Sequence, residues 1–138
     1  MRSILKFTLL AFAIGFLPFE VGCSSGGKVE DFTPKEANAR KALEAALNHW
    51  QGGGQAGTVP NTSPAVEVTD SKWKSGQQLK SYEIVGDEPP VGAGPRFFKV
   101  RLTPVKGAVV ETKYAVLGID PLLIYRDEDY QKLSGAGK

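Results

Sequence analysis

The chain has 138 residues, of which 41% are hydrophobic and 23% are charged, and its formal net charge is +2. This length suits a single domain, and the apolar content argues against global disorder. The 17 basic residues alternate with 15 acidic ones and form no basic stripe. Because nucleic-acid binding needs clustered positive charge, we expect no nucleic-acid partner.

The N-terminus has the pattern of an export signal. Arg2 and Lys6 make a basic start, and an apolar run follows over residues 7–19. This run has the length of a signal-peptide core and is too short to span a bilayer comfortably as a helix. Small residues around Cys23 then provide a cleavage region. We therefore expect a protein that leaves the cytoplasm.

Cys23 is the only cysteine, so the chain cannot form an internal disulfide. The run Val21-Gly22-Cys23 resembles the lipobox of bacterial lipoproteins, in which cleavage leaves an acylated Cys as the first residue; the third position before Cys, normally Leu, is Glu20 here. The resemblance, to small bacterial lipoproteins, implies membrane attachment through lipid on Cys23, at the cell envelope facing the periplasm or the cell surface. Plain secretion after cleavage near Ser24, and an uncleaved anchor, remain alternatives.

The expected domain organisation follows from composition. Residues 1–22 form the signal peptide, and residues 23–32 are small, polar and Gly-rich, as in a flexible tether. A single domain should occupy residues 33–133, followed by a disordered tail over 134–138.

The domain should begin with a helix over residues 34–50. Thr33 is placed as N-cap, Pro34 at the first helical position and Glu36 at the third, which is the capping-box pattern. Gly52-Gly53-Gly54 ends the helical periodicity. The apolar residues of this segment recur at three- and four-residue steps: Ala39, Leu43, Ala46, Leu47 and Trp50.

From residue 65 onward the period of the apolar pattern falls to two, which indicates strands. The segment before it, residues 52–64, is a long loop that serves either as a slack connection or as a functional lip. We predict strands over residues 65–73, 78–85, 96–103 and 109–119, a brief fifth strand over 122–125, a loop over 86–95, and a polar tail with one helical turn over 126–133.

The predicted fold class is α+β, with one N-terminal helix packed on a curved antiparallel sheet of four to five strands. Short connections favour an antiparallel meander, since parallel pairs need long crossovers. The apolar stripe of the helix and the apolar face of the sheet then bury each other. This element order resembles the cystatin-like and nuclear-transport-factor-2-like folds. The expected core consists of Trp50, Tyr82, Phe98, Val100, Leu102, Tyr114 and Val116.

The sequence contains few residue patterns that indicate catalysis or metal binding. His49 is the only histidine, which excludes a His-rich zinc site, and no Gly-x-Ser-x-Gly elbow presents a nucleophile. The acidic run 127–129 lacks the spacing of a Ca²⁺ loop. We predict no catalytic residue, no metal and no cofactor. His49, Trp50 and Trp73 are candidate ligand contacts, with helix capping by His49 and core packing by the indoles as the competing interpretation.

These observations favour an exported, lipid-anchored envelope protein with a non-catalytic interaction or structural domain and an unknown protein partner. The first alternative is a roll domain that binds a small molecule, or with less support acts as an enzyme, through a pocket near His49. The second is a cystatin-like protease inhibitor. The cystatin motif Gln-x-Val-x-Gly is missing, because residues 74–79 read Lys-Ser-Gly-Gln-Gln-Leu.

Overall fold

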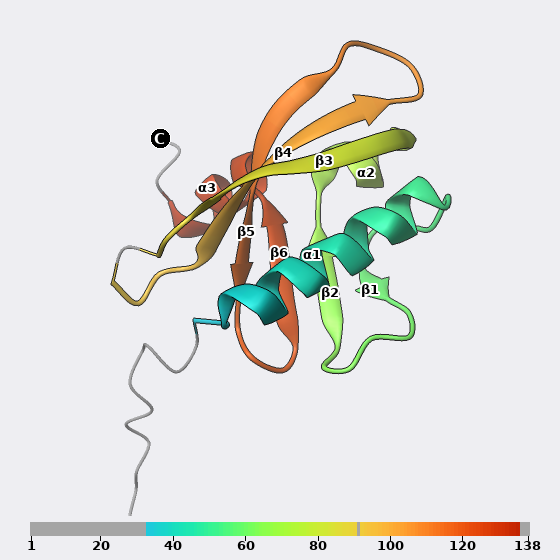
Figure 1. The fold of residues 1–138 in the computed structure, drawn as a ribbon. Coiled ribbons are helices and arrows are strands. Elements are labelled where there is room, and N and C mark those ends of the chain that lie inside the picture. The colour runs from blue at the N-terminus through green and yellow to red at the C-terminus, as the bar shows by residue number, and fades with distance from the viewer. Residues whose placement is uncertain (1–32, 91, 136–138) are drawn as a thin grey trace, which may run out of the picture.

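A six-stranded mixed sheet curls around one long helix in the computed structural model, which describes residues 33–90 and 92–135 (Figure 1). The predicted signal peptide, Cys23 and the predicted tether lie outside the described residues. The helices are α1 (Glu36–Gln51), α2 (Ser71–Lys74) and α3 (Asp127–Ser134). The strands are β1 (Thr58–Val59), β2 (Val66–Thr69), β3 (Leu79–Glu88), β4 (Arg96–Pro104), β5 (Val110–Leu117) and β6 (Leu122–Arg126).

The α+β class is confirmed, but the sheet differs from the predicted antiparallel one of four to five strands. Its order is β1-β2-β6-β5-β4-β3. Strands β3 to β6 form an antiparallel meander, whereas β2 pairs in parallel with β6, from Val66 opposite Leu122 to Thr69 opposite Tyr125. A parallel pair needs a long connection, and the whole β3–β5 meander supplies it. The prediction considered only strands adjacent in sequence.

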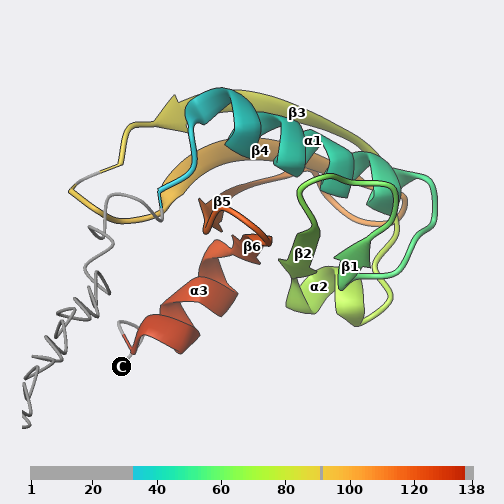
Figure 2. The ribbon, with the colours of Figure 1, turned by 90° about the horizontal axis from the view of Figure 1, so that it is seen from below.

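Helix α1 packs against the concave face of the sheet (Figure 2). Its buried stripe is the predicted one with Ala42 added, because Ala42 falls on the same face. The expected core is confirmed except for Tyr82, which is only partly buried; its hydroxyl donates a hydrogen bond of 2.7 Å to Oδ1 of exposed Asn48. The buried hydrophobic residues of β4 to β6 that share the core cluster with α1 are Phe98, Val100, Leu102, Tyr114, Val116, Leu122 and Ile124.

Helix α3 covers the opposite face of the sheet, so the domain has three layers (Figure 2). The predicted single turn is an eight-residue helix. The Tyr130 ring packs edge-on against the Phe97 ring of β4 at a centroid distance of 5.7 Å. Ala115 of β5 is fully buried although it faces away from α1. The prediction missed this layer because a single aromatic residue in a polar segment gives no periodic signal.

The start of α1 also differs from the predicted capping box. The helix begins at Glu36, and its N-cap residue Lys35 makes no side-chain capping bond. The Thr33 hydroxyl instead donates to the Gly94 carbonyl at 3.1 Å, and Arg96 Nε donates to the carbonyl of the next residue, Pro34, at 2.7 Å. Tertiary bonds to the β3–β4 connection and to β4 have replaced the local cap.

Three further boundaries were predicted wrongly. The first main strand ends at Thr69 instead of continuing to Trp73, because Asp70 begins α2. Strand β3 extends to Glu88, since that residue still pairs with Phe97 of β4. The predicted loop over 52–64 contains β1, which pairs with β2.

Gly118, in the β5–β6 turn, provides a test of how tightly this turn is packed. Its φ of +85° favours glycine, and an added Cβ would lie 2.6 Å from the Pro121 carbonyl oxygen. Gly76 has a φ of +102° with nothing within 4 Å of its Cβ position, so it is the matched control. We expect each Gly→Ala change to lower the unfolding free energy by roughly 1–3 kcal/mol, because alanine is strained at a positive φ.

Gly118→Ala should lower the unfolding free energy clearly more than Gly76→Ala, because its methyl group also clashes with the Pro121 carbonyl oxygen. Urea unfolding of the two variants and of the wild type measures the difference. Equal losses of unfolding free energy would show that the turn relaxes around the new methyl group.

Candidate functional site

The three candidate ligand contacts, His49, Trp50 and Trp73, lie together in the structure. The Trp50 and Trp73 rings are stacked, with centroids 5.2 Å apart and planes at 13°. The His49 ring contacts Trp73 edge-on at 5.9 Å. Both indoles are almost fully buried, with 3% and 5% of their surface exposed. Sequence reasoning therefore selected residues that do meet, in a cluster that is largely closed to solvent.

The polar groups of this aromatic cluster are used to join helices to loops. Trp50 Nε1, on α1, donates to the Gln77 carbonyl at 2.7 Å, and Trp73 Nε1, on α2, donates to the Gly54 carbonyl at 2.8 Å. A Cβ on Gly54 would lie 2.0 Å from the His49 ring. Buried indoles usually find such acceptors, so the cluster primarily fastens α1 to α2.

A cleft of about 550 Å³ borders the aromatic cluster on its solvent side. The edges of Trp50 and Trp73 form part of its wall, and His49 is not among the residues that line it. The remaining lining is polar and flexible: Gln55, Lys74, Gln77 and Gln78, with glycines between them.

A second cluster, centred on buried Asp70, was missed by the sequence analysis. Asp70 Oδ1 accepts from the backbone N–H groups of Lys72 at 3.0 Å and Trp73 at 3.1 Å, which caps α2. Asp70 Oδ2 accepts from the Tyr114 hydroxyl at 2.5 Å. Nη1 of buried Arg126 lies 3.6 Å from Oδ1. An Asp before a helix is a recognisable N-cap signal, but nothing in the sequence links it to β5 and β6.

The Asp70 cluster holds its phenol in the neutral form. Burial raises the pKa of Tyr114 well above its usual value of 10, and the charge and hydrogen bond of Asp70 raise it further. Burial acts to lower the pKa of Arg126, but its anionic surroundings outweigh this and raise it, so the guanidinium stays charged. A neutral phenol bonded to a buried carboxylate is a structural link and supplies no nucleophile at neutral pH.

The acidic run that follows β6 also has structural partners. Asp129 Oδ2 accepts from the Ser71 N–H at 2.8 Å, which ties α3 to the start of α2. Glu128 Oε2 accepts from Arg126 Nε at 2.9 Å. Placing these carboxylates near helix starts suits the helix dipole.

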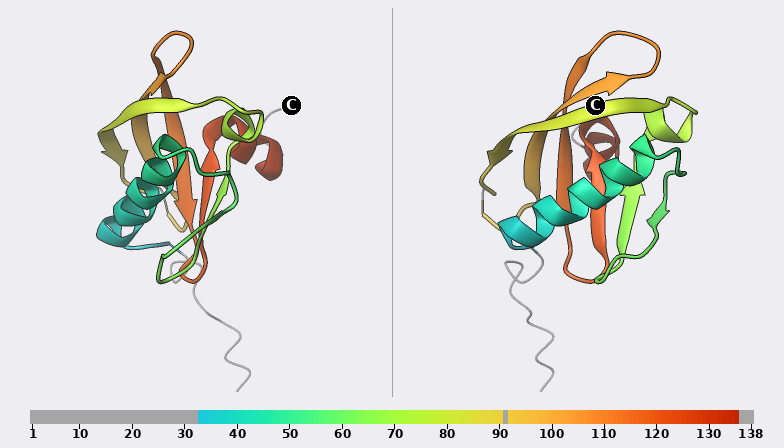
Figure 3. Two further views of the ribbon diagram at one scale, coloured as in Figure 1. Left: turned by 90° about the vertical axis from the view of Figure 1, so that its right-hand side faces the viewer. Right: turned by 45° about the vertical axis from the view of Figure 1, so that its right-hand side comes forward.

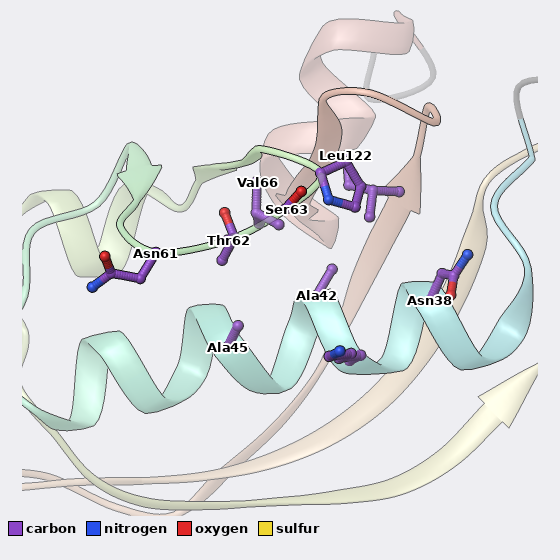
Figure 4. Close-up of a pocket in the computed structure, with 10 residues that line it drawn as sticks. Asn38, Ala42, Ala45, Asn61, Thr62, Ser63, Val66 and Leu122 are labelled. Carbon is purple, nitrogen blue, oxygen red and sulfur yellow. The ribbon is translucent and has the colours of Figure 1, made fainter.

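A third feature, the α1 cleft, lies between α1 and residues 61–64 and has a volume of about 260 Å³ (Figure 4). Ala42 and Ala45 point from the helix into it, as Figure 4 shows, and the polar segment crosses above them. The apolar part of the lining is completed by Pro64, Val66 and Leu122; the polar part consists of Asn38, Lys41, Asn61, Thr62 and Ser63. The sequence indicated only that this loop was long enough to serve as a lip.

The raised pKa of buried Tyr114 predicts that the folded protein loses stability at alkaline pH. The unfolded chain releases the phenol proton above its ordinary pKa of 10, while the folded chain retains it. Unfolding free energy should therefore fall as pH rises beyond 10. Tyr114→Phe should make this fall shallower, leaving the smaller contribution of Tyr82, whose pKa burial also raises. Denaturant unfolding at several alkaline pH values measures how steeply the unfolding free energy falls with pH, and Tyr130→Phe is the control. If Tyr114→Phe leaves this fall as steep as in the wild type, Tyr114 is not its cause.

Substitution of Gly54 tests how tightly the aromatic cluster is packed. Gly54→Ala should displace the His49 ring from Trp73 and lower the unfolding free energy by roughly 1–3 kcal/mol. Gly52 has an ordinary φ of −78°, and its Cβ position lies 3.4 Å from the nearest backbone atom, so Gly52→Ala should change stability by less than about 0.5 kcal/mol. Proton NMR shifts of the His49 ring report the displacement. Similar behaviour of the two variants would show that His49 is not held there.

Comparison with known proteins assigns no relative. No protein-family model matches the chain, and no match was found among curated proteins or solved structures. In the part of the chain that the structure describes, no helix is long and apolar enough to cross a membrane. Within the same ranges, no three His, Cys, Asp or Glu side chains are grouped to hold a metal ion. The functional inference therefore rests on the sequence pattern of the N-terminus and on the chemistry of the clefts.

Proposed function

We propose that this chain is an exported envelope protein, held at a membrane through lipid on Cys23, whose α+β domain binds a protein partner without catalysis. The export signal and the lipobox-like residues support the location. The α1 cleft supports the binding role and is the observation on which it rests.

The lining of the α1 cleft has the chemistry of recognition. Asn38, Asn61, Thr62 and Ser63 supply amide and hydroxyl groups at its rim, over a floor of alanine, valine and leucine side chains. Such a combination of an apolar floor and a few polar groups is typical of binding sites. Lys41 is its one titratable side chain. The groups best suited to proton transfer, such as His49 and Asp70, are engaged in other contacts.

The size of the cleft favours part of a protein over a free small molecule. About 260 Å³ falls below the usual range of roughly 300–1,000 Å³ for small-molecule pockets. One or two side chains of a partner segment would fill it. The amide and hydroxyl groups at the rim favour hydrogen bonding by polar groups of that segment, and Lys41 adds one positive charge.

The position of the cleft fits an anchored protein. The described chain starts, at Thr33, at the same end of the domain as residues 61–64 and the β5–β6 turn (Figures 1 and 3). Residues 24–32 can span at most about 30 Å when fully extended. With lipid on Cys23, a tether of this length would keep the α1 cleft within reach of a partner at the membrane surface.

The cleft beside the aromatic cluster favours a second candidate function, the binding of a small molecule. Its volume of about 550 Å³ lies within the usual range for such sites, and indole edges form part of its wall. Quenching of tryptophan fluorescence by a saturating compound, lost on substitution of Gln55 but kept in α1-cleft variants, would favour this candidate.

Cys23→Ala should remove the membrane anchor. Wild type should incorporate a palmitate analogue and sediment with membranes, whereas Cys23→Ala should incorporate none and lose membrane association. Ser24→Ala keeps the cysteine and is the control. Recovery of unlabelled wild type in the soluble fraction would overturn the anchor.

Photocrosslinking tests the α1 cleft directly. A benzophenone amino acid in place of Asn61 should give a discrete protein adduct in cells that carry the anchored chain. The same amino acid at Ser81, exposed on β3, should give none. Adducts of equal yield at both positions, or none at either, would overturn the assignment of this cleft as the binding surface.

A further inference from the structure

The tip of the β4–β5 hairpin, residues 105–110, is an exposed apolar surface that the proposed function does not use. The hairpin rises beyond the body of the domain in Figure 1 and in both views of Figure 3. Of the six large hydrophobic side chains that are exposed in the described part of the chain, three lie at this tip, with exposed fractions of 52%, 56% and 40%: Val105, Val109 and Val110. A single exposed valine is ordinary, but three within six residues of a projecting tip indicate a contact surface.

The sheet holds the hairpin tip in a fixed position. The Val105 N–H donates to the Gln78 carbonyl at 2.9 Å, which ties the base of the tip to the residues before β3. Leu79, the first residue of β3, pairs with Pro104 at the end of β4. The valines are therefore presented on a preformed scaffold, which lowers the entropy that docking would otherwise cost.

Lysines surround the hairpin tip. Residues 71–82 and 102–110 contain no Asp or Glu. The two segments are neighbours, because α2 and the turn after it meet the base of the hairpin and β3 begins beside the end of β4. Four lysines in these segments are exposed and form no salt bridge with any described residue: Lys72, Lys74, Lys80 and Lys106.

The acidic residues near these lysines have other partners. Glu111, the first acid after the tip, pairs with Lys99 and Arg101. Asp129 accepts from the backbone at the start of α2 and offsets at most one lysine charge. Two carboxylates balance the charge of Arg126, so this residue adds nothing to the positive charge. The charge that remains at this end of the domain is that of exposed lysines.

We propose that the hairpin tip docks on an anionic lipid bilayer, with Val105 and Val109 at the headgroup boundary and Lys106 among the lipid phosphates. Apolar side chains and adjacent lysines are the two sources of affinity for such a surface. Protein interfaces are instead enriched in aromatic residues and Arg and depleted in Lys. The tip contains a lysine and neither an aromatic residue nor an Arg, so its composition favours lipid over a protein groove.

The tether is long enough for this contact to form on the bilayer that would hold the lipid anchor. Thr33 bonds Gly94, just before β4, and the hairpin tip follows the other end of that strand. The nine residues of β4 span roughly 30 Å, which is about the reach of residues 24–32 when fully extended. An anchored domain can therefore lie along the bilayer with its hairpin in contact. The contact itself does not require the anchor.

A dansyl amino acid in place of Ala108, which is exposed at the tip, tests the contact in the full chain reconstituted in vesicles. In phosphatidylcholine mixed with phosphatidylglycerol, the dansyl emission should shift to the blue, and a spin-labelled lipid should quench it. Phosphatidylcholine alone should give a smaller change. The same amino acid at Ser134, exposed on α3, should show neither effect. Palmitate labelling reports the anchor and this signal reports the hairpin, so each proposal can fail alone.

Matched variants separate the contributions of charge and apolar surface. Lys106→Gln should lower the ratio of lipid-bound to free hairpin about fivefold, as expected for one lysine at an anionic surface. Lys132→Gln removes the same charge from α3 and should leave the ratio within about twofold. Val109→Thr should lower the ratio, whereas Val85→Thr, at an exposed valine of β3, should not. Thermal unfolding of each variant confirms that the fold is intact.

Three results would overturn the docking of the hairpin on lipid. The first is the absence of a blue shift and of quenching in anionic vesicles. The second is a signal of equal size in phosphatidylcholine alone, or one that is insensitive to both Lys106→Gln and Val109→Thr. The third is a blue shift without vesicles that grows with protein concentration, which would identify a second copy of the chain as the occupant.

Discussion

The hydrogen bonds of the Asp70 carboxylate are the constraint on which the rest of the domain depends. One oxygen ends β2 and starts α2 by accepting two N–H groups, and the other accepts from Tyr114 of β5. Arg126, at the end of β6, balances the charge. A buried carboxylate is tolerable only when its oxygens are bonded in this way, so a single residue fixes the positions of three strands and a helix relative to one another.

Because α2 begins after Asp70, Trp73 on this helix packs against Trp50 of α1. The two indoles then guide the chain from β2 to β3, the strand at the far edge of the sheet. Their N–H groups bind the carbonyls of Gly54 and Gln77, in the segments that follow α1 and α2. These bonds hold the segment after α1 beside the one before β3, so the sheet can curl around α1 as Figure 2 shows. Two bulges in β3 add to the curvature, since each bulge bends its strand. The concave side is filled by side chains, so the clefts lie at the ends of the domain.

The clefts differ in chemistry because different elements surround them. The α1 cleft borders a polar loop and the small side chains of a helix, and Lys41 is the one charged side chain that lines it. A cleft of about 360 Å³ elsewhere in the domain borders Arg126 at the end of β6, Lys72 of α2 and the turn between β4 and β5.

The sequence by itself determined the long first helix and the four meander strands, because each depends on a local pattern of periodicity; the export signal is a prediction from the same kind of local pattern. It also selected His49 as the only histidine and Trp73 as an aromatic residue at a predicted strand end, together with Trp50 at the end of the predicted helix. Only the tertiary structure decided that β2 pairs with β6, that α3 covers the outer face, and that Thr33 bonds Gly94 in place of a helix cap. It alone brought Asp70 to Tyr114 and Lys72 near Arg126. These contacts join residues far apart in the chain, and their energies arise from burial, which no local pattern records.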